Sequence, residues 1–142
     1  DIKYGGASVD EFSPGGTAGL LTSLDPSIVK ADQLSGSVVG LPGKLPDVLY
    51  EITISPNLLK RVLGTKDELN VEPIKMNEAL MLNVNSAATV GIVTGFKKKN
   101  IVCKLKIPVC AEISSRVTIS RRIGNRFRLI GYGEIQEGKT SL

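Results

Sequence analysis

The stretch ALMLNVNSAATVGIVTGFKKKNIVCKLKI, residues 79–107, contains three runs in which apolar and polar residues alternate. Alternation with a period of two is typical of strands that bury one face. The side chains predicted to face the core are Leu80, Leu82, Val84, Val90, Ile92, Phe96, Ile101, Cys103, Leu105 and Ile107. FKKKN, residues 96–100, separates two of the runs as a hairpin loop does, so consecutive antiparallel strands are expected.

The same rhythm appears on both sides of this stretch. DVLYEITI at 47–54 places Val48, Tyr50, Ile52 and Ile54 on one face, and RVTIS at 116–120 and RFRLIGYGEI at 126–135 continue the pattern. Six or more short runs split by Gly, Pro and Asn predict an all-β fold, either a closed barrel or a sandwich.

Two segments depart from the alternation. SPNLLKRVLG at 55–64 has Pro at a first helical position and Gly at its end, which favours a helix of about two turns, although a bent strand would also fit. DPSIVKAD at 25–32 has the pattern of a single α- or 3₁₀-helical turn.

The first 29 residues contain only one predicted strand. A Pro-Gly-Gly turn leads into a predicted strand at about 19–24, and a lone strand has nowhere to bury its apolar face. We therefore expect residues 1–29 to be the end of a preceding barrel and residues 30–142 to form the C-terminal barrel. The lack of an initiator Met suggests a piece of a longer protein.

Composition narrows the chemistry. The 142 residues include two Cys and no His, which excludes His-dependent nucleophilic catalysis and leaves too few ligands for a zinc site. No run of about 18 apolar residues indicates a membrane span. The net charge of +4 is uneven, because residues 96–142 carry eleven Lys or Arg against three Glu. The C-terminal half is thus a candidate for contact with an anionic partner.

GEIQEGKT, residues 133–140, matches the phosphate-loop pattern G-x-x-x-x-G-K-[ST]. A phosphate loop must open a helix, whose free N-terminal amides complete the anion site. Only Ser141 and Leu142 follow the match, and the residues before it are predicted as a strand through Ile135. We interpret the match as chance, and expect neither a catalytic residue nor a bound cofactor or metal in this chain.

The basic residues give the candidate site. Lys97, Lys98 and Lys99 lie at a predicted hairpin tip, and Arg126 and Arg128 follow a Gly-Asn pair that suits a two-residue turn. These five are candidates for contact with RNA or a partner protein, although lysines on a hairpin also protect it from aggregation. The few aromatic residues are too scattered in the sequence to predict a base-stacking platform.

Arg121 is in phase with core-facing Val117 and Ile119, so its charge needs an explanation. We expect it at a barrel rim, near a bulge, or paired with a carboxylate.

Several stretches in order resemble the gamma subunit of archaeal and eukaryotic translation initiation factor 2. They are PGGTAGLLTSLDPSIVKADQLSGSVVGLPGKLP, LLKRVLG, VEPIKMNEALMLNVNSAATVGIVT, PVCAE and ISRRIGNRFRLIGYGEI. That family is similar to elongation factor Tu, a GTPase domain followed by two β-barrels. The resemblance implies the end of the second domain plus the third, a closed antiparallel barrel. Phe127 stands where the family commonly has Trp, and is expected to fill the same core position.

The resemblance also implies a role. The family carries initiator methionyl-tRNA to the small ribosomal subunit in the cytoplasm, with GTP and magnesium held in a GTPase domain absent from this chain. Implied partners are the rest of the gamma subunit, the alpha and beta subunits and, in eukaryotes, an assembly chaperone that docks on the third domain. From the residues alone, a stand-alone basic RNA-binding barrel is the alternative.

Overall fold

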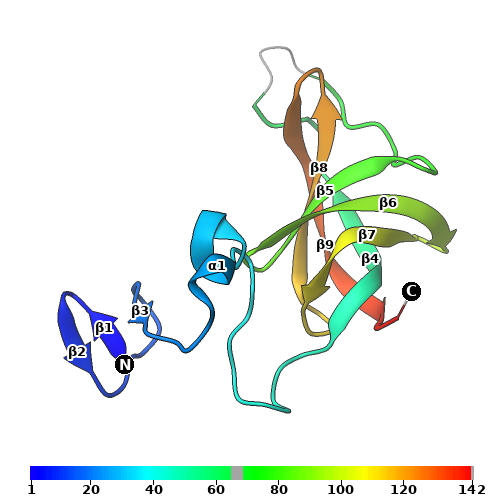
Figure 1. Cartoon of the computed structure of the whole chain (residues 1–142). Coiled ribbons are helices and arrows are strands. Elements are labelled where there is room, and N and C mark those ends of the chain that lie inside the picture. The colour runs from blue at the N-terminus through cyan, green and yellow to red at the C-terminus, as the bar shows by residue number, and fades with distance from the viewer. Residues whose placement is uncertain (65–68, 142) are drawn as a thin grey trace. The chain divides into compact units, whose positions relative to one another are not determined.

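The computed structural model describes residues 1–64 and 69–141, with only the backbone of Ala31. The chain separates into two compact units, Asp1–Leu34 and Ser35–Leu142 (Figure 1).

The first unit contains a small sheet rather than the lone strand expected from the sequence. Strands β1 (Ile2–Tyr4), β2 (Ala7–Val9) and β3 (Gly19–Leu20) pair in the order β2-β1-β3. The predicted strand at 19–24 is therefore only two residues long and has a partner. The predicted helical turn is confirmed as α1 (Pro26–Val29), capped by the Asp25 carboxylate, followed by a 3₁₀ turn at Lys30–Asp32.

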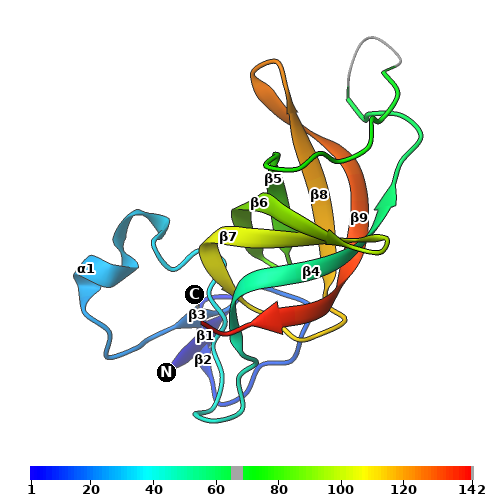
Figure 2. The same ribbon diagram turned by 90° about the vertical axis from the view of Figure 1, so that its right-hand side faces the viewer.

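The second unit is a closed antiparallel barrel, as predicted. Its strands are β4 (Val48–Leu58), β5 (Ala79–Val84), β6 (Ala87–Lys97), β7 (Asn100–Cys110), β8 (Arg116–Ile123) and β9 (Arg126–Lys139). They close in the order β4-β7-β6-β5-β8-β9 (Figures 1 and 2). The two predicted hairpins are both present, with Lys97 opposite Asn100 and Ile123 opposite Arg126.

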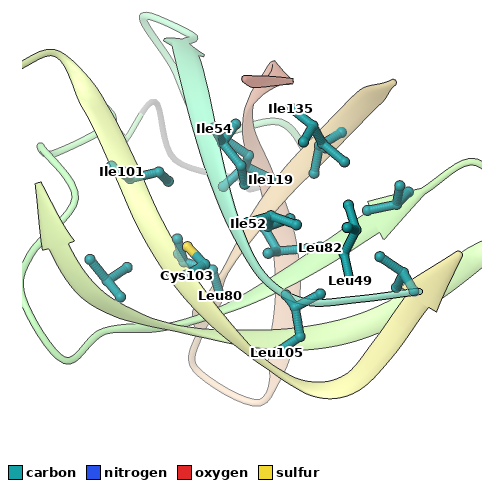
Figure 3. Packing of buried hydrophobic residues seen from close by; sticks show 14 of the residues in the cluster. Leu49, Ile52, Ile54, Leu80, Leu82, Ile101, Cys103, Leu105, Ile119 and Ile135 are labelled. Atoms are coloured by element: carbon teal, nitrogen blue, oxygen red, sulfur yellow. The ribbon is translucent and has the colours of Figure 1, made fainter. Parts of the chain in front are cut away.

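Most of the predicted inward residues fill the barrel (Figure 3). Those confirmed as buried are Ile52, Ile54, Leu80, Leu82, Val84, Ile101, Cys103, Leu105, Val117 and Ile119. Cys103 is fully buried in this cluster, where burial, together with the nearby Glu51 charge, raises its thiol pKa to about 12. It is therefore a core residue rather than a reactive thiol.

The inward prediction was wrong at Val48 and Ile107, which are 45% and 60% exposed. The β4–β7 ladder passes from Leu49 opposite Val109 to Glu51 opposite Lys104, so the two strands advance by different numbers of residues. This bulge reverses the phase, and Leu49 and Val109 take the buried positions.

The prediction of which residues face the core was also wrong for the first part of β6. Thr89, Gly91 and Val93 point inward, whereas Val90 and Ile92 lie on the outer face. These inward residues were hard to recognise from the sequence because Thr89 is polar and Gly91 is small. The buried Thr89 hydroxyl donates a hydrogen bond to the Ile107 carbonyl at 2.8 Å and accepts one from the Ile107 N–H at 3.0 Å. A Cβ on Gly91 would lie 2.5 Å from Leu82 Cδ1, so a larger residue there would displace the Leu82 side chain.

Phe96 lies beyond a second bulge, between Val93 and Gly95, which sets it opposite buried Ile101. It is nevertheless 47% exposed, because it stands near the end of its strand rather than within the barrel.

The helix expected at 55–64 is absent, and the bent-strand alternative is what the structure shows. Strand β4 continues through Ser55 and Pro56 to Leu58, and Leu59 N–H still donates to the Ile130 carbonyl at 2.8 Å. The β4–β7 pairing ends at Ile54, so Pro56 pairs only with Gly133 of β9. The missing proline N–H therefore breaks no ladder hydrogen bond to β7, which lets the strand pattern prevail.

Candidate functional site

The three lysines of the candidate site lie at the β6–β7 turn. Lys98 occupies the first turn position with φ of 58°, and Lys97 is the last residue of β6. Lys97 Nζ donates to Glu137 Oε2 at 2.5 Å, and that contact lowers the pKa of the Glu137 carboxyl, through the hydrogen bond first and the charge second. Because both side chains are exposed, the pair contributes little to stability. Lys98 and Lys99 are exposed beside it.

The two arginines of the candidate site lie on the β8–β9 hairpin. Arg126 is exposed at the first position of β9, opposite Ile123. Arg128 is half-buried, and its guanidinium lies against Gly64: a Cβ there would be 2.7 Å from Arg128 Nη1. Arg126 is therefore the more accessible of the two cations.

The structure does not bring these two groups together. Lys97 contacts Glu137, which is nine positions beyond Arg128 on the same strand, a path of roughly 30 Å at about 3.3 Å per residue. Figures 1 and 2 both show the β6–β7 turn well apart from the β8–β9 turn. The five candidates thus form two separate basic regions, not one face.

Two of the alternatives expected for Arg121, a carboxylate partner and a nearby bulge, are confirmed. Arg121 pairs with Glu78 through Nε and Nη2, and its guanidinium also donates to the carbonyls of Glu72 at 2.9 Å and Pro73 at 3.1 Å. Both side chains of the ion pair are mostly buried, at 16% and 17% exposed, next to a bulge between Ile119 and Ser120. Arg121 thus fastens the segment before β5 to the barrel and is a structural residue.

The phosphate-loop pattern lies in strand β9, from Gly133 to Lys139, with Thr140 directly after it. Gly133 is required by packing, because a Cβ there would lie 2.5 Å from the Ser55 carbonyl oxygen. Lys139, the residue that would hold phosphate, pairs with Glu51 at 2.6 Å. The hollow beside it has a volume of about 80 Å³, well below the roughly 300–1,000 Å³ of ordinary ligand pockets. This segment is a strand and not a nucleotide cradle.

The described residues contain no cluster of three His, Cys, Asp or Glu side chains that could hold a metal ion, and Cys103 and Cys110 are free thiols. Within the same residues, no helix has the length and apolar character needed to cross a membrane.

Comparison with known proteins gives a consistent result. The family model described as initiation factor eIF2 gamma, C terminal, matches residues 50–135. Translation initiation factor 2 subunit gamma of Thermococcus kodakarensis is 54% identical over 136 residues, 96% of this chain. The proteins of the same name from Pyrococcus furiosus and Methanocaldococcus jannaschii are 54% and 52% identical over 96% and 95% of it. The chain spans about a third (33%) of the length of these relatives.

Proposed function

The chain belongs to the family of the C-terminal part of the eIF2 gamma subunit, a translation initiation factor, and from this we propose that it is a non-catalytic β-barrel module of that factor. In this role it supports GTP-dependent delivery of initiator methionyl-tRNA to the small ribosomal subunit in the cytoplasm. Its contribution is positional, because the barrel holds other parts of the factor in place and offers surfaces to partners.

The main support for the non-catalytic role is that GEIQEGKT belongs to strand β9 through Lys139. Its glycine and lysine serve strand packing and an ion pair with Glu51, which leaves no phosphate cradle in that segment. GTP and magnesium would then be bound by the part of the parent protein outside the region matched here. The absence of His from the sequence also argues against acid–base catalysis by this module.

The proposed partners follow from the same membership. They are the rest of the gamma subunit, the alpha and beta subunits and, through the whole factor, initiator tRNA and the small subunit. In a eukaryotic context an assembly chaperone would dock on this domain. We assign RNA or partner contact to Lys97, Lys98, Lys99, Arg126 and Arg128, with Lys98, Lys99 and Arg126 as the more accessible contacts.

The test is a titration of the 142-residue chain with small-subunit ribosomal RNA, the intact small subunit, and the alpha and beta subunits, across a salt series. One variant reverses Lys97, Lys98 and Lys99 to Glu, and a second reverses Arg126 and Arg128. Lys106→Glu is the control, because Lys106 is an exposed cation outside both regions.

RNA binding that weakens with salt and falls in either reversal variant, but not in the control, supports the RNA contact. Binding to a protein subunit alone supports the scaffold role and removes the RNA assignment. Binding to none of these partners contradicts the proposal.

A further inference from the structure

The β8–β9 hairpin extends past its neighbours in the barrel. The pairing of β8 with β5 ends at Arg121, and the pairing of β9 with β4 ends at Gly131. Two further rungs, Arg122 opposite Phe127 and Ile123 opposite Arg126, belong to the hairpin alone. Figures 1 and 2 show this hairpin reaching the upper edge of the barrel. These last two rungs therefore lie beyond the β5 and β4 ladders of the barrel.

Two aromatic rings lie on the outer face of this hairpin. On β8, Val117 and Ile119 point to the core, so Thr118, Ser120 and Arg122 point outward. Their partners on β9 are Tyr132, Leu129 and Phe127 in the same order. The bulge between Ile119 and Ser120 matters here, because simple alternation along β9 would put Phe127 and Tyr132 on opposite faces.

Both rings are partly exposed to solvent. Phe127 is 41% exposed and Tyr132 is 48% exposed, so the core position expected for Phe127 was wrong. Among the described residues the close ring pair is Tyr4 with Phe12, in the other unit, so neither ring is covered by another aromatic. Tyr132 is opposite Thr118 and Phe127 is opposite Arg122. Thr118 and Arg122 are four residues apart on β8, so the two rings are separated by roughly 13 Å along the hairpin.

Cations flank the upper ring. Arg122 is directly opposite Phe127, and its Nε donates to the Gly124 carbonyl at 3.3 Å. Arg126 is exposed at the turn. Lower on the face, Arg116 is opposite Glu134, so the charges there are balanced. Positive charge is thus concentrated where the hairpin projects.

We propose that the outer face of β8–β9 binds unpaired RNA, with bases stacked on Phe127 and Tyr132 and the backbone phosphates held by Arg122 and Arg126. Exposed aromatic rings on a sheet next to arginines are the combination that receives splayed-out bases, because every base has a flat face to stack. Paired RNA keeps its bases stacked on one another and cannot use the rings. This inference rests on the proposed role in an RNA-containing complex, and adds a second mode of contact to the charged residues.

The experiment uses the 142-residue chain and two fluorescently labelled RNAs, a ten-nucleotide unpaired oligomer and a blunt-ended duplex. Binding is read by anisotropy. Phe127→Leu and Tyr132→Leu remove a ring without changing charge. Phe96→Leu is the matched control, because Phe96 is equally exposed on the other hairpin. Phe127→Trp and Tyr132→Phe keep a ring, and thermal melts verify that every variant is folded.

We expect each Leu variant to weaken binding of the unpaired oligomer by about tenfold, in line with the usual contribution of one stacked base. Affinity for the duplex should stay within about twofold, since its contacts are to phosphates. The control and both ring-retaining variants should bind like the parent chain.

The proposal is overturned if the Leu variants bind the unpaired oligomer unchanged, if the Phe96 control loses as much affinity, or if the chain binds no unpaired RNA. Unchanged binding in the Leu variants together with a loss in the charge-reversal variants would leave the proposed function intact and remove only the stacking face. If the Leu variants lose a protein subunit instead, the face is a protein interface and the RNA inference is wrong.

Discussion

The two ends of strand β9 carry similar positive charge and use it differently. At the C-terminal end, Lys139 pairs with Glu51, and Lys97 of the neighbouring hairpin pairs with Glu137. At the N-terminal end, Arg126 is exposed, and Phe127 beside it is opposite Arg122. The comparison teaches that a count of cations does not identify a binding surface. What matters is whether the pairing of the strands has already placed a carboxylate beside each cation.

The largest expected effect separates two adjacent arginines of β8. Arg121→Met should destabilise the chain by about 2–4 kcal/mol, because the mostly buried Glu78 carboxylate loses its cationic partner and keeps the hydrogen bond from the Lys75 N–H. Arg122→Met should leave stability nearly unchanged, since Arg122 is exposed. Urea unfolding of both variants measures the change in the free energy of unfolding. An equal decrease in the two variants would show that the Arg121–Glu78 pair does not stabilise the barrel.

The next effect concerns the glycine of the phosphate-loop pattern. Gly133→Ala should cost about 1–3 kcal/mol, because its methyl group would press on the backbone of Ser55. Gly95→Ala, in another strand, meets no atom closer than 3.9 Å and should be nearly neutral. Urea midpoints of the two variants give the comparison. A stable Gly133→Ala protein would mean that the β4–β9 contact is looser than described.

A smaller effect compares two cations in RNA binding: Arg122, which forms no ion pair among the described residues, and Lys97, which pairs with Glu137. Arg122→Gln should reduce the slope of log affinity against log salt by about 0.7 if it holds one phosphate of single-stranded RNA. Lys97→Gln should change the slope less, since Glu137 already neutralises Lys97. Anisotropy titrations at four or more salt concentrations measure both slopes. A larger change for Lys97 would reverse our ranking of the two regions.

The smallest effect is on the Lys97–Glu137 pair itself. Its folded-state carboxyl pKa is lowered, so the stabilisation is present above the ordinary Glu pKa and is lost as pH falls through the folded value. Lys97→Met should return the pKa of Glu137 toward its ordinary range. A carboxyl-detected NMR titration of both proteins measures the change, and an unshifted pKa in the parent chain would show that the pair does not form in solution.

Much of the fold was predictable from alternation alone. Strands β5 and β8 follow it without interruption, and their inner residues Leu80, Leu82, Val117 and Ile119 were assigned correctly because each is large and apolar and they recur at every second position. The charged exception, Arg121, was also anticipated, since an inward position demands a partner. These strands have one apolar face, which fixes their register.

The errors occur where a bulge or a small residue hides the phase. Val48 and Ile107 were misplaced by the β4–β7 bulge, and the inner row of β6 was missed because Thr89 and Gly91 are not hydrophobic in appearance. Bulges leave no reliable mark in a single sequence, since the extra residue can have any side chain. The 55–64 segment was ambiguous because leucine suits both structures.

The same limitation hid the aromatic face. Phe127 was expected in the core, and Tyr132 stands five residues away, an odd separation that alternation assigns to the opposite face. The bulge at Ile119–Ser120 places both on one surface. The basic candidates were visible in the sequence, but the ion pair that neutralises Lys97 joins residues forty positions apart and needs the folded barrel.

The most direct test of the account is an NMR titration of the isotope-labelled chain with the unpaired RNA oligomer, following backbone amides of both hairpins. We predict that the largest shift changes fall on residues 116–132 of β8 and β9, including the amides of Phe127 and Tyr132, with small changes at Lys97 and Glu137. Changes concentrated at the β6–β7 turn instead, with β8–β9 unaffected, would contradict the central claim that the outer face of β8–β9 is the RNA-binding surface.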